Sequence, residues 1–324
     1  MHIDSPSLEL VKLHKIYFKM SGEMEIFFRG LGDGEKLKYP AVHAEAFRTP
    51  NGTSYLKEPG VVLLAQSVPH LSGLEEFLRG FDPGLQFEKY LEDPEKLDPS
   101  AQIVKIAGQL CYMSLGPKRT MNKDVRKYVG NLVGSGHGSV LEHPNFTLFF
   151  YGVSRSFTHE LVRHRAGMGY SQESQRYVGG NVLRFVERPE FQVDAVLHQQ
   201  FEERIDRVAK EYEDTTTRLL QLQGEGLNIV VAEHTSDKRK KVRQASRAVL
   251  TNEAEGVIVA TGNIRAWRHI FSMRANEHAE IEIRRATFKA FICLREVEPT
   301  SFSDFEIVNL PDGTYAVKTE HPKV

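Results

Sequence analysis

The chain has 324 residues, of which 40% are hydrophobic and 26% charged, and its formal net charge is -1. This composition is ordinary for a globular protein with a packed core. The near-neutral charge argues against a nucleic-acid coat, a membrane-surface protein or an acidic tail, so any charge that matters for function must be local.

Residues 1–60 read as strands joined by tight turns. The stretches MEIFFRG and KLKYPAV flank the glycine-rich LGDGE, and HAEAFRT leads into PNGTSYL through an Asn51-Gly52 turn. We predict a β-rich N-terminal extension over residues 1–60, followed by a main domain over residues 61–300.

A helix and a strand precede the arginine-rich centre of the chain. The stretch NKDVRKYVGNLVGSG has apolar residues at helical spacing and predicts an amphipathic helix that stops at Gly134. The aromatic stretch FTLFFYGV, residues 146–153, predicts a buried strand. Ser154 or Ser156 then offers an N-cap for a helix running to about Arg165.

The second half of the chain is predicted to be largely helical. FQVDAVLHQQFEERIDRVAKEYEDTTTRLLQLQ predicts one long helix, SDKRKKVRQASRAVLTNE predicts another that starts at a Ser236 or Asp237 cap, and EGVIVAT predicts a strand. Asn263 can cap a helix over IRAWRHIFSMR, and HAEIEIRRATFKAFICLRE carries an apolar helical stripe.

The last residues, 301–324, are predicted to form a β-hairpin and tail, with FEIVNLPDGTYAVKT folding around Asp312-Gly313. Helices and strands do not alternate strictly along the chain. An α+β fold is therefore favoured over a doubly wound sheet.

The two cysteines, Cys111 and Cys293, form no CxxC pair, which favours a reduced compartment. We expect a cytoplasmic protein without a leader or a membrane partner. No basic-then-apolar stretch opens the sequence, and none approaches the roughly 18 apolar residues of a spanning helix.

Two histidine motifs resemble ligand sites but lack their defining features. HELVRH, residues 159–164, is similar to the helix of zinc proteases, but on a helix His159 and His164 would point about 140° apart and could not chelate one ion. We expect no metal site. GSGHGS lacks the GK[ST] of a phosphate loop and reads as a helix stop, with His137 as a turn residue and His143 as a core histidine.

The arginines indicate a phosphate-bearing ligand. On a helix, Arg163 and Arg165 would lie about 200° apart and would serve two different surfaces. Arg176 follows the small, polar loop AGMGYSQESQ, and guanidinium forks match phosphate oxygens two at a time. Further arginines occur at 243, 247, 265, 268, 274, 284 and 285. A structural ion-pair network and a nucleic-acid groove are the alternatives, and the latter fits the near-neutral charge poorly.

The stretch RHRAGMGYSQESQRY resembles the signature of the flavin-dependent thymidylate synthases, in which RHR is followed by a serine and an Arg-Tyr pair. GHGSVLEHPNFTLFF is similar to that family's GHxSxxEH segment, QLCYMS to its small-residue entry helix, and NIRAWRHIFSMRANEHAEIEI to its arginine helix and HAQxEI stretch. The resemblance covers roughly residues 60–295, with the segments in the expected order.

This resemblance implies a homotetramer with a mixed sheet and long helices, whose residues 61–300 bind flavin and nucleotide. It implies reductive methylation of dUMP to dTMP, with methylenetetrahydrofolate as the carbon donor, FAD as the hydride source and NADPH as the reductant. Neither Cys111 nor Cys293 has the electropositive setting that a nucleophilic thiolate needs. This fits the resemblance, because hydride from reduced flavin can take the place of a thiolate. The alternatives are an inactive flavin- or nucleotide-binding scaffold and a flavin-dependent methylase of another uracil substrate.

The resemblance also implies a set of site residues. For FAD they are His137, Ser139, Glu142, Arg163, His164, Arg165, Gln172, Asn263, Arg265 and His269. For dUMP they are Glu160, Arg163, Gln172, Glu173, Ser174, Gln175, Arg176, Arg247 and Arg274. Arg274 matches the arginine that polarises the pyrimidine at N3 and O4, and it is the predicted electrostatic catalyst.

The signature departs from the usual pattern at the nucleotide loop. Here AGMGYSQE separates RHR from Ser174, one residue more than usual, so the loop bulges or the equivalence shifts by one. Glu160, Gln172 and Glu173 remain alternatives for the acidic role. His269 replaces an asparagine found in many relatives. The sequence assigns no residues to the folate and NADPH sites and no role to residues 1–60.

Overall fold

An antiparallel sheet forms the centre of the computed structural model, which describes residues 16–18, 24–28, 40–92, 97–117, 125–177, 179–322 and 324. Its strand order is β1-β2-β3-β6-β7-β10-β8. The strands are β1 (Ile16–Phe18), β2 (Met24–Phe28), β3 (Pro40–Val42), β6 (Gly60–Gln66), β7 (Asn145–Tyr151), β8 (Met168–Gln172) and β10 (Ile258–Asn263). Strands β1, β2 and β3 therefore extend the main sheet.

Every pairing within this sheet is antiparallel, so the prediction of a mixed sheet is wrong for it. Parallel pairing occurs in a second sheet, where β5 (Ser54–Leu56) lies between antiparallel β4 (Ala46–Arg48) and parallel β9 (Arg184–Val186). Strands β11 (Glu306–Asn309) and β12 (Tyr315–Lys318) form a hairpin.

Both short turns predicted from Asn-Gly and Asp-Gly are confirmed. Gly52 joins β4 to β5 with a φ of 92°, and Gly313 joins β11 to β12 with a φ of 78°. Left-handed φ values of this kind favour glycine. The predicted LGDGE turn lies outside the described residues. The division into three domains stays a prediction.

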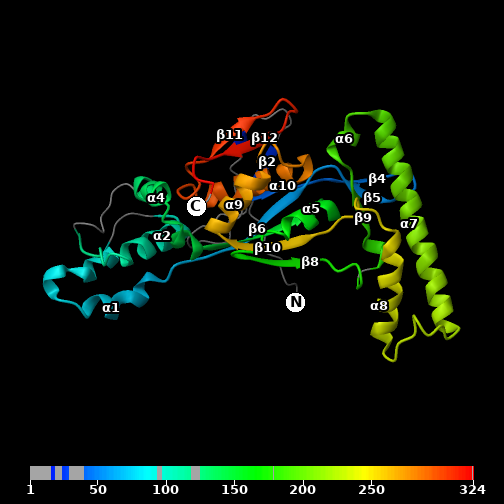
Figure 1. Cartoon of the computed structure of the whole chain (residues 1–324), viewed down its shortest axis with the longest axis horizontal. Coiled ribbons are helices and arrows are strands. Elements are labelled where there is room, and N and C mark those ends of the chain that lie inside the picture. The colour runs from blue at the N-terminus through cyan, green and yellow to red at the C-terminus, as the bar shows by residue number, and fades with distance from the viewer. Residues whose placement is uncertain are drawn as a thin grey trace, which may run out of the picture.

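Helix α10 (Ile281–Val297) packs across the sheet against β3, β6 and β7, and α9 (Ile264–Arg274) lies beside it. Figure 1 shows both helices and the β11–β12 hairpin near the centre of the molecule. The predicted apolar stripe of α10 is confirmed, because Ile283, Ala286, Ala290 and Leu294 are fully buried, as is Cys293. Burial of this stripe fixes α9 and α10 on the sheet.

Helix α5 (Arg155–Leu161) also lies near the centre, and the remaining α-helices lie at the two ends of the long axis (Figure 1). One end holds α1 (Glu75–Arg79), α2 (Pro99–Leu110) and α4 (Val125–Gly134), and the other holds α6 (Pro189–Gln192), α7 (Ala195–Gly224) and α8 (Thr235–Ser246). The α+β class is confirmed. In the part of the chain that the structure describes, no helix combines the length and apolar character needed to span a membrane.

Short 3-10 helices connect these elements. They are η1 (Leu71–Leu74), η2 (Pro83–Leu85), η3 (Phe87–Glu92), η4 (Gly138–Glu142), η5 (Gly180–Val182) and η6 (Arg247–Val249). The predicted stop at Gly134 is confirmed, and the chain passes from α4 through a turn into η4.

Four predicted helix boundaries are wrong. Helix α5 (Arg155–Leu161) starts at the predicted Ser154 cap, but it ends four residues before Arg165. The predicted long helix is broken because Asp194 accepts a hydrogen bond from the Leu197 N–H and starts α7 afresh. Helix α8 begins at Thr235, after His234 rather than at a Ser236 or Asp237 cap, and it ends at Ser246 instead of continuing to Glu253.

Candidate active site

Arg274, at the end of α9, is held by two side chains from the α5 region. Its guanidinium donates from Nη1 to Glu160 Oε2 over 2.7 Å and from Nε to His164 Nε2 over 2.9 Å. Its side chain is 24% exposed. The guanidinium is therefore fixed in orientation and still accessible, as electrostatic stabilisation of a substrate anion requires.

The backbone around His164 is held by Tyr170 on β8. The Tyr170 hydroxyl lies 2.7 Å from the His164 carbonyl and 3.0 Å from the Leu161 carbonyl, so its single proton is shared between them. Because this side chain contacts the end of α5, the chain turns toward β8 instead of continuing as a helix. Sequence reasoning missed Tyr170, since one tyrosine in a strand carries no distinctive signal.

His164 is neutral at pH 7. Burial lowers its pKa, the positive charge of Arg274 lowers it further, and His269 adds to the effect, bringing the value to about 4. The rings of His164 and His269 meet edge to face with centroids 5.6 Å apart. A neutral imidazole explains how His164 Nε2 accepts a hydrogen bond from Arg274.

We expect the stability of the protein to fall as the pH drops from about 6.5 toward 4, in part because of His164. The unfolded histidine takes up a proton near its ordinary pKa of 6.5, whereas the folded one resists protonation down to about 4. Between pH 7.5 and pH 5 the wild type should therefore lose unfolding free energy. In His164→Gln this loss should be smaller by about 1 kcal/mol, which is half the value expected for a fully buried group because His164 is partly exposed.

Urea unfolding at the two pH values measures this effect. His278→Gln is the matched control, because the His278 side chain is 88% exposed and should leave the pH dependence as in the wild type. Equal pH dependence in His164→Gln and His278→Gln would contradict the assignment.

A second group of predicted residues surrounds η4 and the start of α9. Arg265 on α9 pairs with Glu142 of η4, with Nη1 2.5 Å from Oε1. A Cβ on Gly138 would lie 3.0 Å from Arg265 Nε, so the glycine backbone closely approaches this guanidinium. His137 and Ser139, on either side of Gly138, are exposed, which confirms His137 as a turn residue. Four predicted FAD residues, His137, Ser139, Glu142 and Arg265, thus lie together around η4 and the start of α9.

Asn263 joins this second group to the RHR segment. Its side-chain oxygen caps α9 by accepting from Ala266 N over 2.8 Å, as predicted. Gly167, with a φ of 70°, lies so close that a Cβ there would be 2.7 Å from Asn263 Nδ2. Asn263 therefore links the start of α9 to the turn that follows Arg165.

Arg163 and Arg165 lie in the turn after α5, so the argument from their helical splay is wrong. Both side chains are exposed, and among the residues that the structure describes neither makes a hydrogen bond or an ion pair. Because the turn precedes β8 at the edge of the sheet, the two guanidinium groups are available to a ligand or to another subunit.

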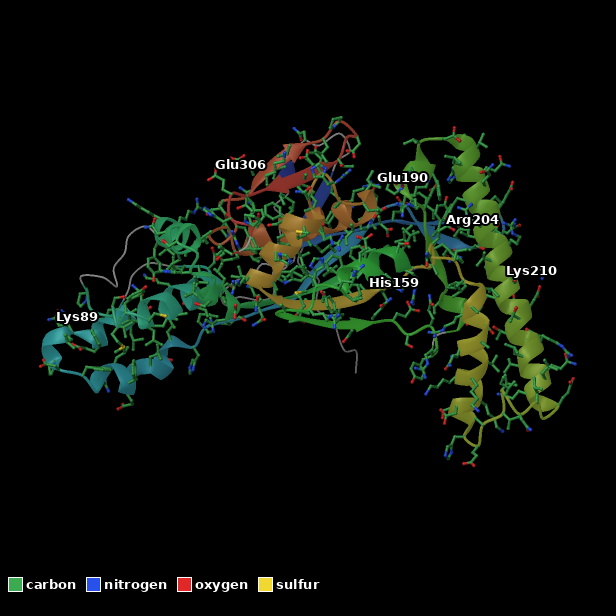
Figure 2. All side chains as sticks on the ribbon, viewed as in Figure 1. Lys89, His159, Glu190, Arg204, Lys210 and Glu306 are labelled. Carbon is green, nitrogen blue, oxygen red and sulfur yellow. The ribbon has the colours of Figure 1, made fainter. Side chains whose placement is uncertain are left out.

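His159 and His164 do not share a helix either, because α5 ends before His164, so their predicted divergence of about 140° on one helix is wrong. Figure 2 shows His159 on α5, where it is exposed. Within the described ranges, no group of three or more histidine, cysteine, aspartate or glutamate residues is arranged to hold a metal ion.

Four of the predicted dUMP residues, Glu173, Ser174, Gln175 and Arg176, follow the far end of β8, whereas Glu160 and Arg274 lie together on α5 and α9. Met168 of β8 pairs with Gly262, next to Asn263, whereas Gln172 pairs with Ile258 at the other end of β10. At about 3.4 Å per residue, Gln172 lies roughly 14 Å from Met168. Gln172 therefore stands apart from the FAD group around Arg265, although it was predicted to belong to both groups.

Hydrogen bonds tie this segment to α5. Gln172 Nε2 donates to Thr158 Oγ1 over 3.1 Å, and Arg155 Nη1 donates to Gln175 Oε1 over 3.3 Å. Ser174 follows in the same loop and is half-buried. Of the three candidates for the acidic role, Glu160 is the one with a described contact to Arg274.

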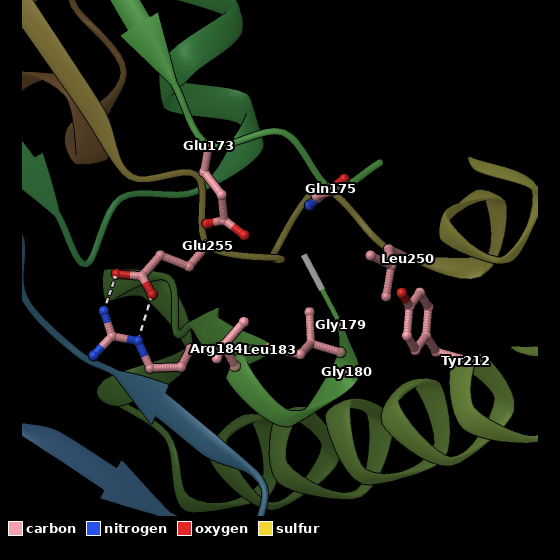
Figure 3. A pocket seen from close by; sticks show the side chains of 10 residues that line it. Glu173, Gln175, Gly179, Gly180, Leu183, Arg184, Tyr212, Leu250 and Glu255 are labelled. Atoms are coloured by element: carbon pink, nitrogen blue, oxygen red, sulfur yellow. Dashed lines mark hydrogen bonds and ion pairs between the residues drawn. The ribbon is translucent and has the colours of Figure 1, made fainter. Parts of the chain in front are cut away.

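Glu173 points into a small pocket bordered by Arg184, Glu255 and Tyr212 (Figure 3). Burial and the charge of Glu255 raise its pKa, against the opposing charges of Arg184 and Arg155. Arg184 is itself bound to Glu255 by two hydrogen bonds of 2.5 and 2.8 Å. The cavity of about 20 Å³ has room for a water molecule but not for a nucleotide.

Arg176 borders a larger cavity of about 600 Å³ that is basic on balance, because Lys240 and Lys241 line it together with the carboxylates of Glu233 and Asp237. Its Nε is buried and has no hydrogen-bond partner within the described residues. Arg247, at the end of α8, likewise has no described side-chain partner. A buried guanidinium nitrogen without a partner among the described residues, as in Arg176, suits an anionic ligand.

A sequence profile of the Thy1 family, described as thymidylate synthase complementing protein, matches residues 95–300. The flavin-dependent thymidylate synthase of Mycolicibacterium vanbaalenii is 42% identical over 217 residues, which cover 67% of this chain and 84% of that protein. The enzyme of that name from Mycobacterium tuberculosis H37Ra is 40% identical over the same length.

This chain belongs to the flavin-dependent thymidylate synthase family. The resemblance of the RHR and HAEIEI segments to that family is confirmed. Among solved structures, the UMP/dUMP methylase PolB from Streptomyces cacaoi, bound with 5-Br dUMP, has a TM-score of 0.51 and is 20% identical. The match covers 76% of this chain and 94% of PolB, so the two share a fold.

Several arginines of this thymidylate synthase family member form ion pairs with carboxylates of the same chain. Arg268 binds Asp304, Arg284 binds Asp312, and Arg285 binds Glu58. For these three, the alternative of a structural ion-pair network is correct. The expectation of a core histidine is wrong for His143, which is exposed because it follows the short η4 helix at the surface.

Proposed function

We propose that this protein methylates dUMP to dTMP reductively, with methylenetetrahydrofolate as the carbon donor and NADPH-reduced FAD as the hydride source. Membership in the flavin-dependent thymidylate synthase family carries the assignment. The contact of Arg274 with Glu160 and His164 supports it, because a fixed, accessible cation is what a uracil anion needs.

In this proposal Arg274 binds the pyrimidine at N3 and O4. Negative charge develops on the uracil ring when hydride enters, and the guanidinium stabilises it without having to reorient. Glu160 and His164 hold Arg274 in place, and the neutral imidazole adds no competing positive charge.

The groups around η4, Asn263 and the RHR turn fit a flavin with an anionic diphosphate. Gly138 lies against Arg265 and Gly167 against Asn263, which brings these predicted flavin contacts together, and the guanidinium groups of Arg163 and Arg165, which have no partner among the described residues, suit phosphate oxygens. Bound FAD, when reduced, supplies the hydride that replaces a thiolate nucleophile. Arg265 and His269 on α9 complete the flavin side of the site.

The nucleotide phosphate is assigned to the loop after β8. Ser174, Gln175 and Arg176 are the proposed contacts, together with Arg247 and the basic cavity beside Arg176. Because Gln172, just before this loop, lies roughly 14 Å from Met168 at the end of β8 next to Asn263, we propose a homotetramer in which subunits share each site. The reduced cysteines support a cytoplasmic location.

The decisive test is tritium release from 5-tritiated dUMP with FAD, methylenetetrahydrofolate and NADPH. We expect release that requires all three and yellow protein that NADPH bleaches under anaerobic conditions. No release by the wild type would overturn the proposal, and colourless protein that binds no added FAD would support an inactive scaffold. Faster methylation of UMP than of dUMP would indicate a different uracil substrate.

A further inference from the structure

The segment 301–324 follows directly after the residues that match the family profile. It packs against α9, the helix that carries Arg265, His269 and Arg274. Strand β12 contacts both α9 and α10, and Tyr315 stacks on Phe288 of α10 with ring centroids 5.2 Å apart. The segment therefore touches the helix that carries Arg274.

A fully buried arginine in the middle of α9 takes its described partners from this segment. Arg268 Nη1 and Nη2 donate to the two carboxylate oxygens of Asp304 over 2.6 and 2.8 Å. Nη1 also donates to the Ser301 carbonyl over 2.6 Å, and Nε donates to the Val324 carbonyl over 2.8 Å. The guanidinium lies 4.9 Å from the Phe305 ring centre. A buried cation needs such partners, so α9 is tied to the segment at this point.

The same segment fixes the end of α9. The N–H of Val317 on β12 donates to the carbonyl of Ala275 over 2.8 Å, and Ala275 follows Arg274 directly. The Thr319 hydroxyl donates to Asp304 Oδ2. Burial opposes ionisation of Asp304, but its hydrogen bonds and the charge of Arg268 outweigh burial and lower the pKa of this carboxyl. Asp304 is thus an ionised anchor at neutral pH.

We infer that residues 301–324 form a clamp on α9 and that Asp304, acting through Arg268, is a positioning residue that keeps the Arg274 guanidinium against Glu160 and His164. The effect of the clamp on catalysis rests on the proposed function. The positioning of Arg274 does not rest on it, because the contact between Arg274 and His164 exists without substrate. Loss of the clamp would let the last turn of α9 shift and move the catalytic cation.

Asp304→Asn tests the clamp, because it keeps the side-chain shape and removes the charge. We expect kcat to fall about 10-fold or more at little-changed flavin content, since a small displacement of a catalytic group is costly. We also expect the pKa of His164 to rise by about 0.5–1 unit from its depressed value, because the Arg274 charge moves away. NMR titration of the histidine rings gives this value, with His164→Gln identifying the signal.

Asp304→Glu keeps the carboxylate charge, so it should recover much of the wild-type kcat and much of the lowered pKa of His164. Glu306→Gln is the matched control in the same hairpin; Figure 2 shows Glu306 on β11, where it is exposed, and it should titrate and turn over like the wild type. A folded Asp304→Asn protein with an unchanged His164 titration would overturn the clamp.

If Asp304→Asn does not fold, Thr319→Val removes one donor to Asp304 and gives the milder test. An unchanged His164 pKa and kcat in this variant would then overturn the inference. The titration reports on the clamp even if no thymidylate is formed, so failure of the proposed function and failure of the clamp can be told apart.

Discussion

Replacing Arg274 by alanine should lower kcat for dUMP methylation by about 10²–10³-fold, the loss seen when one preorganised donor to a developing anion is removed. The flavin colour of the purified protein should persist, because the exposed arginines of the RHR turn are unchanged. Tritium release from labelled dUMP measures turnover, and absorbance near the flavin band measures cofactor content.

Two further variants sharpen this test. Arg274→Lys keeps the charge but cannot contact Glu160 and His164 through two edges at once, so partial activity is expected. Arg239→Ala removes an exposed arginine of α8 and should leave turnover unchanged. Wild-type turnover in Arg274→Ala would remove this residue from the catalytic role.

Gly152→Ala should lower the free energy of unfolding by about 2–5 kcal/mol, the combined scale of left-handed backbone strain and overpacking. Gly152 has a φ of 62°, and a Cβ there would overlap the backbone oxygen of Glu58. Its N–H also donates to Glu255 Oε1 over 2.6 Å. The residue turns the chain from β7 into α5, so Glu160 should be displaced as well. Urea unfolding and kcat measure the two effects.

Gly226→Ala separates the effect of left-handed backbone strain from the effect of overpacking. Gly226 has a φ of 87°, and a Cβ added there would have no neighbouring atom of the described residues within 4 Å, so only the backbone strain applies. Its expected loss is about 1 kcal/mol. Equal losses in Gly152→Ala and Gly226→Ala would contradict the predicted overlap with Glu58.

Local signals predicted much of the fold. The Ser154 and Asn263 caps, the Asn51-Gly52 turn and the apolar stripe of α10 are all confirmed, because caps, tight turns and periodic burial depend on neighbouring residues. The end of α5 was predicted incorrectly, because it depends on a hydroxyl from β8 that contacts the helix end only after the sheet has formed.

The residues of the candidate site could be predicted from the sequence, but their contacts could not. Motif spacing selected Arg274, His164 and Glu160, but nothing in the spacing said that they would touch. The sequence also could not separate the arginines that bind carboxylates, such as Arg268, from those without a described partner, such as Arg163. An ion pair depends on which distant residue lies opposite.

By itself, the sequence determined the family, the α+β class and the set of residues from which the site is built, because these depend on motif order and local periodicity. Only the tertiary structure decided which acidic residue lies on Arg274, which arginines stay unpaired among the described residues and how residues 301–324 hold α9. These contacts join segments far apart in the chain, and their geometry follows from packing α9 and α10 against the sheet.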